Sequence, residues 1–214
     1  RLPVSVVTDK TPLDWMFSEY PVVKRGTRQP HMIGRGWPAP MRRWCTGRKQ
    51  ESLRAHLLAL THRQDFSLPL QQCVGFAADE MHRLDGPTKK DGTYYVQRYP
   101  LMEWGITEAD ALAFCQGYGF DWFGLYNHFS RVSCFCCPLQ SLDDLRTLRC
   151  FYPELWQRML HMDAWLQGND KGRRYNHAPS VAALDVRFAA EEAAGAYAHS
   201  DNAKIQKEVT CHGQ

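Results

Sequence analysis

Short apolar runs and longer segments with helical spacing divide this chain into predicted strands and helices. Residues 4–7 belong to an apolar run, which is typical of a buried strand; residues 71–77 predict a second buried strand and residues 94–98 a further short one. The segments with helical spacing or helix-forming composition are residues 46–61, 107–116, 142–148, 153–166 and 181–198. Two of these predicted helices carry recognisable start signals. Thr107 is followed at capping-box spacing by Asp110, and Pro153 stands at a first helical position.

Because helices separate the strands, the pattern predicts an α/β fold with a mainly parallel sheet, flanking helices and a helical C-terminal region. We expect one domain over residues 1–166, followed by a helical extension and a polar tail over residues 167–214. Residues 20–42 are rich in Pro, Gly and basic side chains and predict a long loop. The chain opens at Arg1 directly before the first apolar run, which indicates a fragment whose first segment is not represented.

Composition narrows the class of protein. The chain of 214 residues is 44% hydrophobic, enough for a sizeable core. Its 26 basic and 23 acidic residues leave a net charge of +3, too balanced by itself to indicate nucleic-acid binding. No apolar run approaches the roughly 20 residues of a membrane-spanning helix, and no secretory signal is visible. We therefore expect a cytoplasmic protein with no membrane partner.

Eight cysteines form the densest chemical signal, and in a chain of this length we expect cytosolic thiols, some of them metal ligands. Cys134 and Cys137 have the C-x-x-C spacing that brings two thiolates to one metal across a tight turn. A redox pair and inert buried thiols are the alternatives. Zinc and a cubane cluster each take four ligands, so other residues must contribute, and Cys136 and Cys150 compete for the fourth place.

Two further groups of residues indicate an anion site. Asp79 and Glu80 directly follow a predicted strand, where α/β sheets bind ligands, and they are suited to hold Mg²⁺ or to orient Arg83. The alternative for this pair is a capping or salt-bridging role. A basic rim, whose arginines can clamp phosphate or sulfate, is the second group. It consists of Arg25, Arg28, Arg35, Arg42, Arg43, Arg48 and Lys49. The alternative for the rim is a solvated basic face.

Four blocks in order carry a family resemblance over residues 36–160. They are Cys45-x-x-Arg48-Lys49; Gly75 to Glu80 followed by Arg83; Tyr99 to Trp104 followed by Glu108-x-Asp110; and Leu125-Tyr126, Arg131 and Cys134-x-x-Cys137-Pro138. Together they resemble the phosphoadenylyl-sulfate and adenylyl-sulfate reductase family. That resemblance implies the adenine nucleotide α-hydrolase-like fold, whose members include ATP-dependent enzymes of sulfur insertion.

The resemblance also implies site residues. Cys45 would join Cys134 and Cys137 around a [4Fe-4S] cluster or a zinc ion. Trp44 stands where the cluster-bearing reductases have a further cysteine, so the fourth ligand stays open. Arg43, Arg48 and Lys49, with Asp79, Glu80 and Arg83, would lie near the bound nucleotide, which is ATP or a sulfonucleotide, and Mg²⁺ would accompany it. The family's catalytic cysteine corresponds loosely to Cys211, and its Ser-Gly-Gly-x-Asp-Ser phosphate loop is not found.

Two functions are therefore expected from the sequence. The first is a nucleotide-binding enzyme of sulfur chemistry, which either activates a substrate with ATP for sulfur transfer or reduces a sulfonucleotide. A sulfur-donor protein or a nucleic acid is its possible macromolecular partner. The second is a non-catalytic module, stapled by its metal, that contacts nucleic acid or a partner protein.

Overall fold

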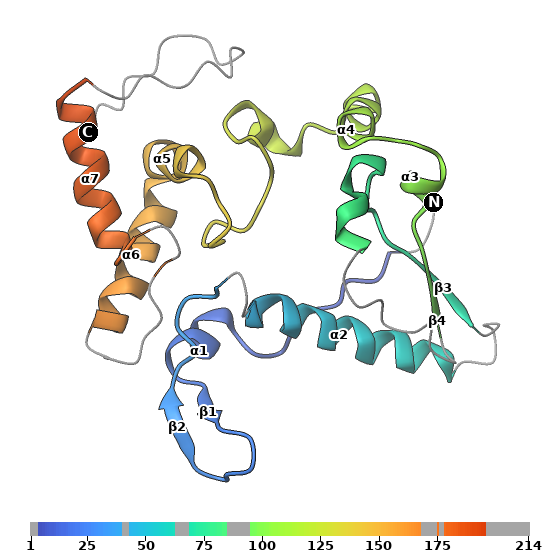
Figure 1. The fold of residues 1–214 in the computed structure, drawn as a ribbon, viewed down its shortest axis with the longest axis horizontal. Helices are drawn as coiled ribbons and strands as arrows, with labels where there is room; N and C mark the ends of the chain where they lie inside the picture. The colour runs from blue at the N-terminus through green and yellow to red at the C-terminus, as the bar shows by residue number, and fades with distance from the viewer. Residues whose placement is uncertain are drawn as a thin grey trace. The chain divides into compact units, whose positions relative to one another are not determined.

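The computed structural model describes residues 4–39, 43–62, 69–84, 95–167, 175 and 178–195. The chain forms two compact units, each taken by itself below (Figure 1). Unit 1 comprises Arg1–Val7 and Gln50–Phe123, and unit 2 comprises Thr8–Lys49 and Gly124–Gln214. Helix α2, Trp44–Thr61, begins in unit 2 and continues into unit 1. These units divide the chain differently from the expected boundary at residue 166.

Unit 1 contains the one parallel strand pair among the described residues. β3, Leu70–Cys73, pairs in parallel with β4, Tyr95–Arg98. The 3-10 helix η1, Ala78–Leu84, and the helices α3, Pro100–Glu103, and α4, Glu108–Gly117, complete its described elements. The capping box predicted at the start of α4 is confirmed, because the Thr107 side chain accepts from Asp110 N and the Asp110 side chain accepts from Thr107 N.

Unit 2 is mostly helical. Its helices are α1, Leu13–Ser18; α5, Leu142–Phe151; α6, Pro153–Gln167; and α7, Val181–Ala193. A β-hairpin follows α1, with β1, Pro21–Val23, antiparallel to β2, Pro30–Ile33. A second 3-10 helix, η2, covers Trp122–Asn127, across the boundary between the units. The predicted helices at α2, α4, α5, α6 and α7 are thus confirmed, with ends shifted by a few residues.

The large buried core lies in unit 2. Trp37 is fully buried, and its ring packs edge-on against Phe17 and Tyr175, at centroid distances of 4.9 and 5.1 Å. Its indole Nε1 donates to Asp163 Oδ1 at 3.0 Å, so the buried polar edge of the ring is satisfied. Because Trp37 lies 126 residues before Asp163, this contact ties the N-terminal part of unit 2 to α6.

Two predicted features differ from the structure, and a third is left as a prediction. Residues 4–7 form no strand, and Val4 and Val6 are 86% and 84% exposed, so the buried strand predicted there was wrong. An apolar run becomes a strand only where a partner strand pairs with it, and the described residues offer it none. The predicted loop of residues 20–42 contains the β1–β2 hairpin. The predicted mainly parallel sheet remains a prediction, because the described strands form two sheets of two strands each.

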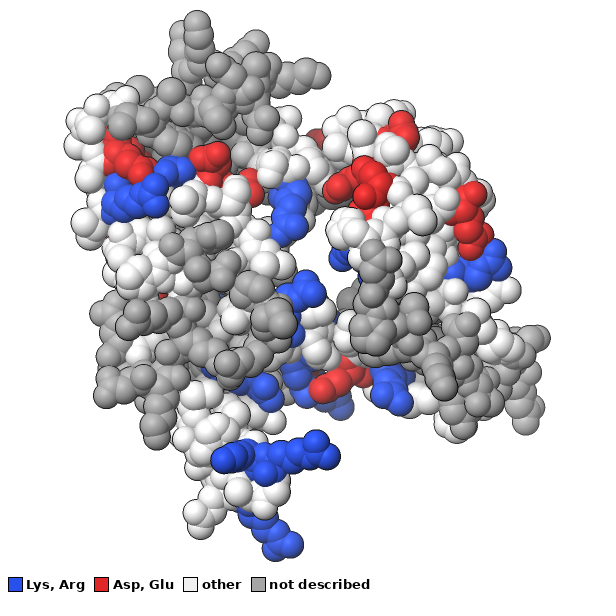
Figure 2. Space-filling view, in the orientation of Figure 1, with Lys and Arg blue, Asp and Glu red and all other residues white. Residues whose placement is uncertain are grey.

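Ion pairs join α5 to α7 on the surface of unit 2. Arg146 Nε donates to Glu191 Oε2 at 2.9 Å, and Arg149 Nε donates to Asp185 Oδ1 at 2.7 Å. Figure 2 shows acidic and basic side chains side by side over these two helices. Within the described part of the chain, no helix combines the length and the apolar composition needed to cross a bilayer.

Candidate metal centre

The C-x-x-C segment of unit 2 is a tight turn held against the core. Cys137 N donates to Cys134 O at 3.0 Å, which closes the turn between the two cysteines. The carbonyl oxygen of Cys137 also accepts from the buried Tyr175 hydroxyl at 2.7 Å. This hydrogen bond fixes the end of the turn, so Cys134 and Cys137 are presented by an ordered backbone.

Cys45 lies in the first turn of α2, and the start of this helix is anchored within unit 2. Trp44 Nε1 donates to Gly36 O at 3.1 Å. The first turn of a helix presents backbone N–H groups that have no partner within the helix. The Cys45 side chain is half-buried.

Cys136 is influenced by cysteines of both the start of α2 and the turn at residues 134–137. Its side chain is 8% exposed and belongs to the hydrophobic core. Burial raises the pKa of the Cys136 thiol to about 12, and the negative charges of Cys134, Cys45 and Cys137 raise it further in the same direction. Cys45 therefore lies near enough to the turn at residues 134–137 to act electrostatically on Cys136.

The four thiols fit a soft metal by chemical type, since zinc and iron–sulfur clusters are bound by thiolates. As the side chains stand, no group of three or more His, Cys, Asp or Glu residues in the described part of the chain is arranged around a single point for an ion. A bound cation would offset the repulsion that now raises the pKa of Cys136. Cys45, Cys134 and Cys137 are the residues that would hold the metal.

The two candidates for the fourth ligand differ in their surroundings. Cys136 lies in the same turn as Cys134 and Cys137. Cys150 lies on α5, where its Sγ is 4.0 Å from Glu192 Oε1, and it is disulfide-bonded. Because a disulfide sulfur is not a thiolate, Cys136 is the better placed of the two.

Two of the predicted cations lie beside this cluster. Lys49 Nζ is 3.5 Å from Cys134 Sγ, one helical turn after Cys45. Arg48 instead forms a two-pronged ion pair with Asp9, with Nε to Oδ2 at 2.8 Å and Nη2 to Oδ1 at 2.9 Å. The Arg48 hydrogen bonds are the main reason that the pKa of Asp9 falls from 3.8 to about 2. Arg43 is exposed, immediately before α2.

The predicted carboxylates lie in unit 1 and take structural roles there. Asp79 Oδ1 accepts from Glu108 N at 3.1 Å, at the start of α4. Glu80 accepts from Ala77 N at 3.1 Å and pairs with Arg83, whose guanidinium lies over the Phe76 ring. Burial would raise the pKa of Glu80, but these two hydrogen bonds lower it below its ordinary value. The capping or salt-bridging role therefore describes Asp79 and Glu80, and Glu80 orients Arg83.

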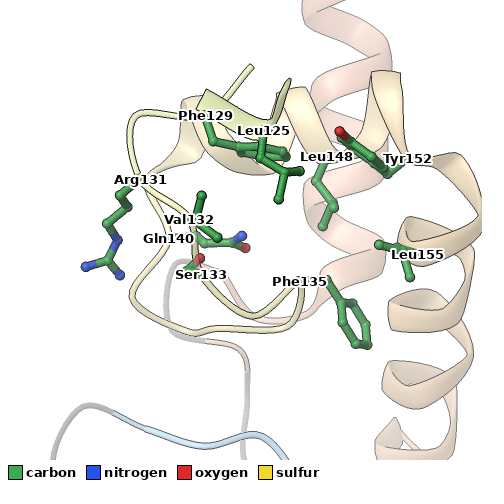
Figure 3. A pocket seen from close by; sticks show the side chains of 10 residues that line it. All are labelled: Leu125, Phe129, Arg131, Val132, Ser133, Phe135, Gln140, Leu148, Tyr152 and Leu155. Atoms are coloured by element: carbon green, nitrogen blue, oxygen red, sulfur yellow. The ribbon is translucent and has the colours of Figure 1, made fainter. Parts of the chain in front are cut away.

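A cavity of about 250 Å³ lies beside the cysteine turn in unit 2 (Figure 3). Val132, Ser133 and Phe135 supply one side of it. The other side is largely apolar and comes from Leu125, Phe129, Leu148, Tyr152 and Leu155, while Arg131 and Gln140 also line it. In Figure 3 the Arg131 guanidinium points away from the apolar side chains. The cavity is therefore an apolar space within reach of the cysteine loop.

Two of the predicted residues lie outside the described part of the chain, and two residues that contact the site were not predicted. Cys211 and Arg42 lie outside the described residues. Asp9, the partner of Arg48, and Tyr175, which holds the cysteine turn, carry no local sequence signal that marks these roles. Comparison of the chain with models of protein families, with curated proteins and with solved structures found no match.

Proposed function

We propose that this chain is a nucleotide-binding enzyme of sulfur chemistry, similar to the phosphoadenylyl-sulfate reductases, with an iron–sulfur or zinc centre on Cys45, Cys134 and Cys137. One observation carries the proposal: the start of α2, which bears Cys45, reaches the cysteine turn, since Lys49 Nζ is 3.5 Å from Cys134 Sγ. Cysteine thiolates are the ligand type that zinc and iron–sulfur clusters take.

Lys49 connects this centre with an anionic substrate. Its ammonium lies 3.5 Å from Cys134 Sγ, which places a positive charge beside the cysteine turn. The same charge attracts a phosphate or sulfate that approaches the cysteine turn. When bound, the metal would join the start of α2 to this turn. Cys136 is the fourth ligand that we propose.

Of the two versions of this chemistry, we favour ATP-dependent activation. In this version a nucleophilic oxygen of the substrate attacks the α-phosphorus of ATP, forms an adenylate and releases pyrophosphate. The reductive version needs a catalytic cysteine, and the segment around Cys211 resembles the reductase nucleophile only loosely. Mg²⁺, if used, would come with the nucleotide, because Asp79 and Glu80 already accept backbone hydrogen bonds.

The alternative is a non-catalytic module in which the metal is only a staple. The pairing of Arg48 with Asp9 favours it, because that guanidinium is already engaged by a carboxylate. Calorimetric titration of the full chain with ATP and with a sulfonucleotide separates the two functions. We expect binding of one of them, weakened about tenfold by Lys49→Ala, because a charge-assisted hydrogen bond is lost.

Arg54→Ala is the matched control, because Arg54 is an exposed cation on the same helix, beyond the first turns that carry Cys45 and Lys49. This substitution should leave the affinity unchanged. If the metal-loaded chain binds neither nucleotide, the enzyme is excluded and the module remains.

A further inference from the structure

Positive charge is concentrated in one segment of the chain. Residues 20–50 contain eight Lys and Arg and no Asp or Glu. The rest of the chain therefore holds 18 of the 26 basic residues and all 23 acidic ones, so the small net charge of +3 conceals a strongly basic segment in an acidic remainder. Most of the described part of this segment lies in unit 2, and its first elements are the strands of the β1–β2 hairpin.

The hairpin presents its turn in a fixed conformation. Thr27 N donates to Lys24 O at 3.0 Å, and the Thr27 hydroxyl donates to the same oxygen at 2.9 Å. Gly26 has φ +85°, the left-handed conformation that the third position of a type II turn requires. A turn that is ordered before binding loses little conformational entropy when it meets a partner.

The base of the hairpin is anchored to its own unit. Gly34 N donates to Tyr20 O at 2.8 Å, and Arg35 N donates to Met16 O at 3.1 Å. The Arg35 guanidinium lies 4.3 Å from the centre of the Tyr20 ring. Gly34 fits so closely that an added Cβ would lie 2.5 Å from Phe17 O. The tip is therefore held on a rigid base.

The cations at the tip have no acidic partner among the described residues. Lys24, Arg25 and Arg28 are all exposed, and no ion pair is formed by any of them within the described ranges. Three exposed arginines elsewhere are paired, Arg98 with Glu103, Arg158 with Asp14 and Arg187 with Glu191. Figure 2 shows basic side chains on the visible face of the hairpin. Unpaired cations on an ordered turn are available to an external anion.

We propose that the β1–β2 hairpin binds duplex DNA, with Lys24, Arg25 and Arg28 contacting backbone phosphates and with no dependence on base sequence. A two-stranded ribbon fits the major groove of B-form DNA, and cations along its tip can reach the phosphates at the groove edge. The deep and narrow major groove of duplex RNA does not admit side chains in this way. Residues 24–29 include no apolar side chain that would enter a bilayer.

This proposal does not depend on the metal centre or on nucleotide binding, because the cations lie on the hairpin and not on the cysteine turn. The partner that it assigns to the basic segment is duplex DNA. Neutralising phosphates releases counterions from DNA, so each contact adds a salt dependence of about −0.9 to the slope of log K against log salt.

Fluorescence anisotropy of the full chain with a labelled random-sequence DNA duplex, over a range of salt concentrations, tests the proposal. The triple variant Lys24→Gln, Arg25→Gln, Arg28→Gln should bind DNA at least about tenfold more weakly at low salt. Its slope of log K against log salt should be less steep by about 2.7. The variant Arg25→Lys, Arg28→Lys keeps the charge and should retain the affinity within about twofold, which separates loss of charge from loss of fold.

A matched triple variant, Arg98→Gln, Arg158→Gln, Arg187→Gln, removes the same charge from ion-paired sites. It should change the affinity by less than about twofold. Equal losses of DNA affinity in the two triple variants would overturn the proposal. So would binding of the RNA duplex as tight as that of DNA, or a preference for anionic phospholipid vesicles or polyglutamate over the DNA duplex.

Discussion

Lys49 Nζ lies 3.5 Å from Cys134 Sγ, although the two residues are 85 positions apart in the chain. Lys49 follows Cys45 by one helical turn of α2, and Cys134 begins the turn that carries Cys136 and Cys137. The contact therefore joins the two segments that contribute cysteines.

The thiol of Cys136 should resist alkylation in the folded, metal-free protein. Its pKa of about 12, against an ordinary 9.0, leaves about a thousandfold less thiolate near neutral pH, and burial blocks access. Iodoacetamide should modify the exposed Cys134 before Cys136, as followed by mass spectrometry at pH 8. Denaturant should remove the difference. Equal rates for the two thiols in the native protein would contradict their placement.

The same shift has a consequence for stability. Because folding raises the pKa of Cys136, the neutral thiol stabilises the fold fully below pH 9. This contribution should disappear as the pH rises from about 9 towards about 12. Denaturation curves of the metal-free protein should show the decline, and Cys136→Ala should be less sensitive to pH over that range.

Asp9 should titrate well below an ordinary aspartate. Its carboxylate is held by Arg48, so its pKa falls from 3.8 to about 2. The ion pair stabilises the fold above about pH 4 and should be lost as the pH falls from about 4 to about 2. Carbon-13 NMR of the labelled carboxyl measures this directly. Arg48→Gln should return the pKa towards 3.8, and a value unchanged by this substitution would exclude the pair.

Gly34→Ala should destabilise unit 2 more than Gly26→Ala. Both glycines have positive φ, which costs an alanine about 1–2 kcal/mol. At Gly34 the added methyl group would also meet Phe17 O at 2.5 Å and the Trp165 ring at 2.6 Å, whereas nothing lies within 4 Å at Gly26. We expect a loss of about 3 kcal/mol or more at Gly34 and about 1 kcal/mol at Gly26 by urea denaturation. Similar losses at both sites would mean that the hairpin base is not tightly packed.

Asp163→Ala should be strongly destabilising because Asp163 satisfies two donors. Its Oδ1 accepts from Trp37 Nε1 at 3.0 Å, and its Oδ2 accepts from Ala182 N at 3.2 Å. Leaving both without an acceptor should cost about 3 kcal/mol in the free energy of unfolding. Asp163→Asn keeps one carbonyl oxygen and should lose about half as much. Equal effects of the two substitutions would show that the carboxylate is not the link between Trp37 and α7.

The helices were predictable because their signals are local. Thr107 with Asp110 and Pro153 mark helix starts by themselves, and the structure begins α4 and α6 at these signals. The strands depend on partners that are distant or absent. Residues 4–7 look like a strand but have no partner among the described residues, and the β1–β2 hairpin lies in a segment with loop composition.

The candidate site was partly predictable for the same physical reason. The C-x-x-C spacing identifies Cys134 and Cys137 locally, and only the family resemblance singled out Cys45. No local pattern indicates that Asp9 neutralises Arg48 across 39 residues, or that Tyr175 holds the Cys137 carbonyl. Such contacts arise from tertiary packing, in which residues meet irrespective of their spacing along the chain.

The metal content of the anaerobically purified full chain tests the shared cysteine site most directly. Elemental analysis, with a visible absorption spectrum to separate iron–sulfur from zinc, should find about one metal centre per chain. Cys45→Ser should lose it, whereas Cys73→Ser and Cys115→Ser, which alter free thiols of unit 1, should retain it. A wild-type chain with neither iron nor zinc near one equivalent, or a Cys45→Ser variant that keeps its metal, would contradict the proposed centre.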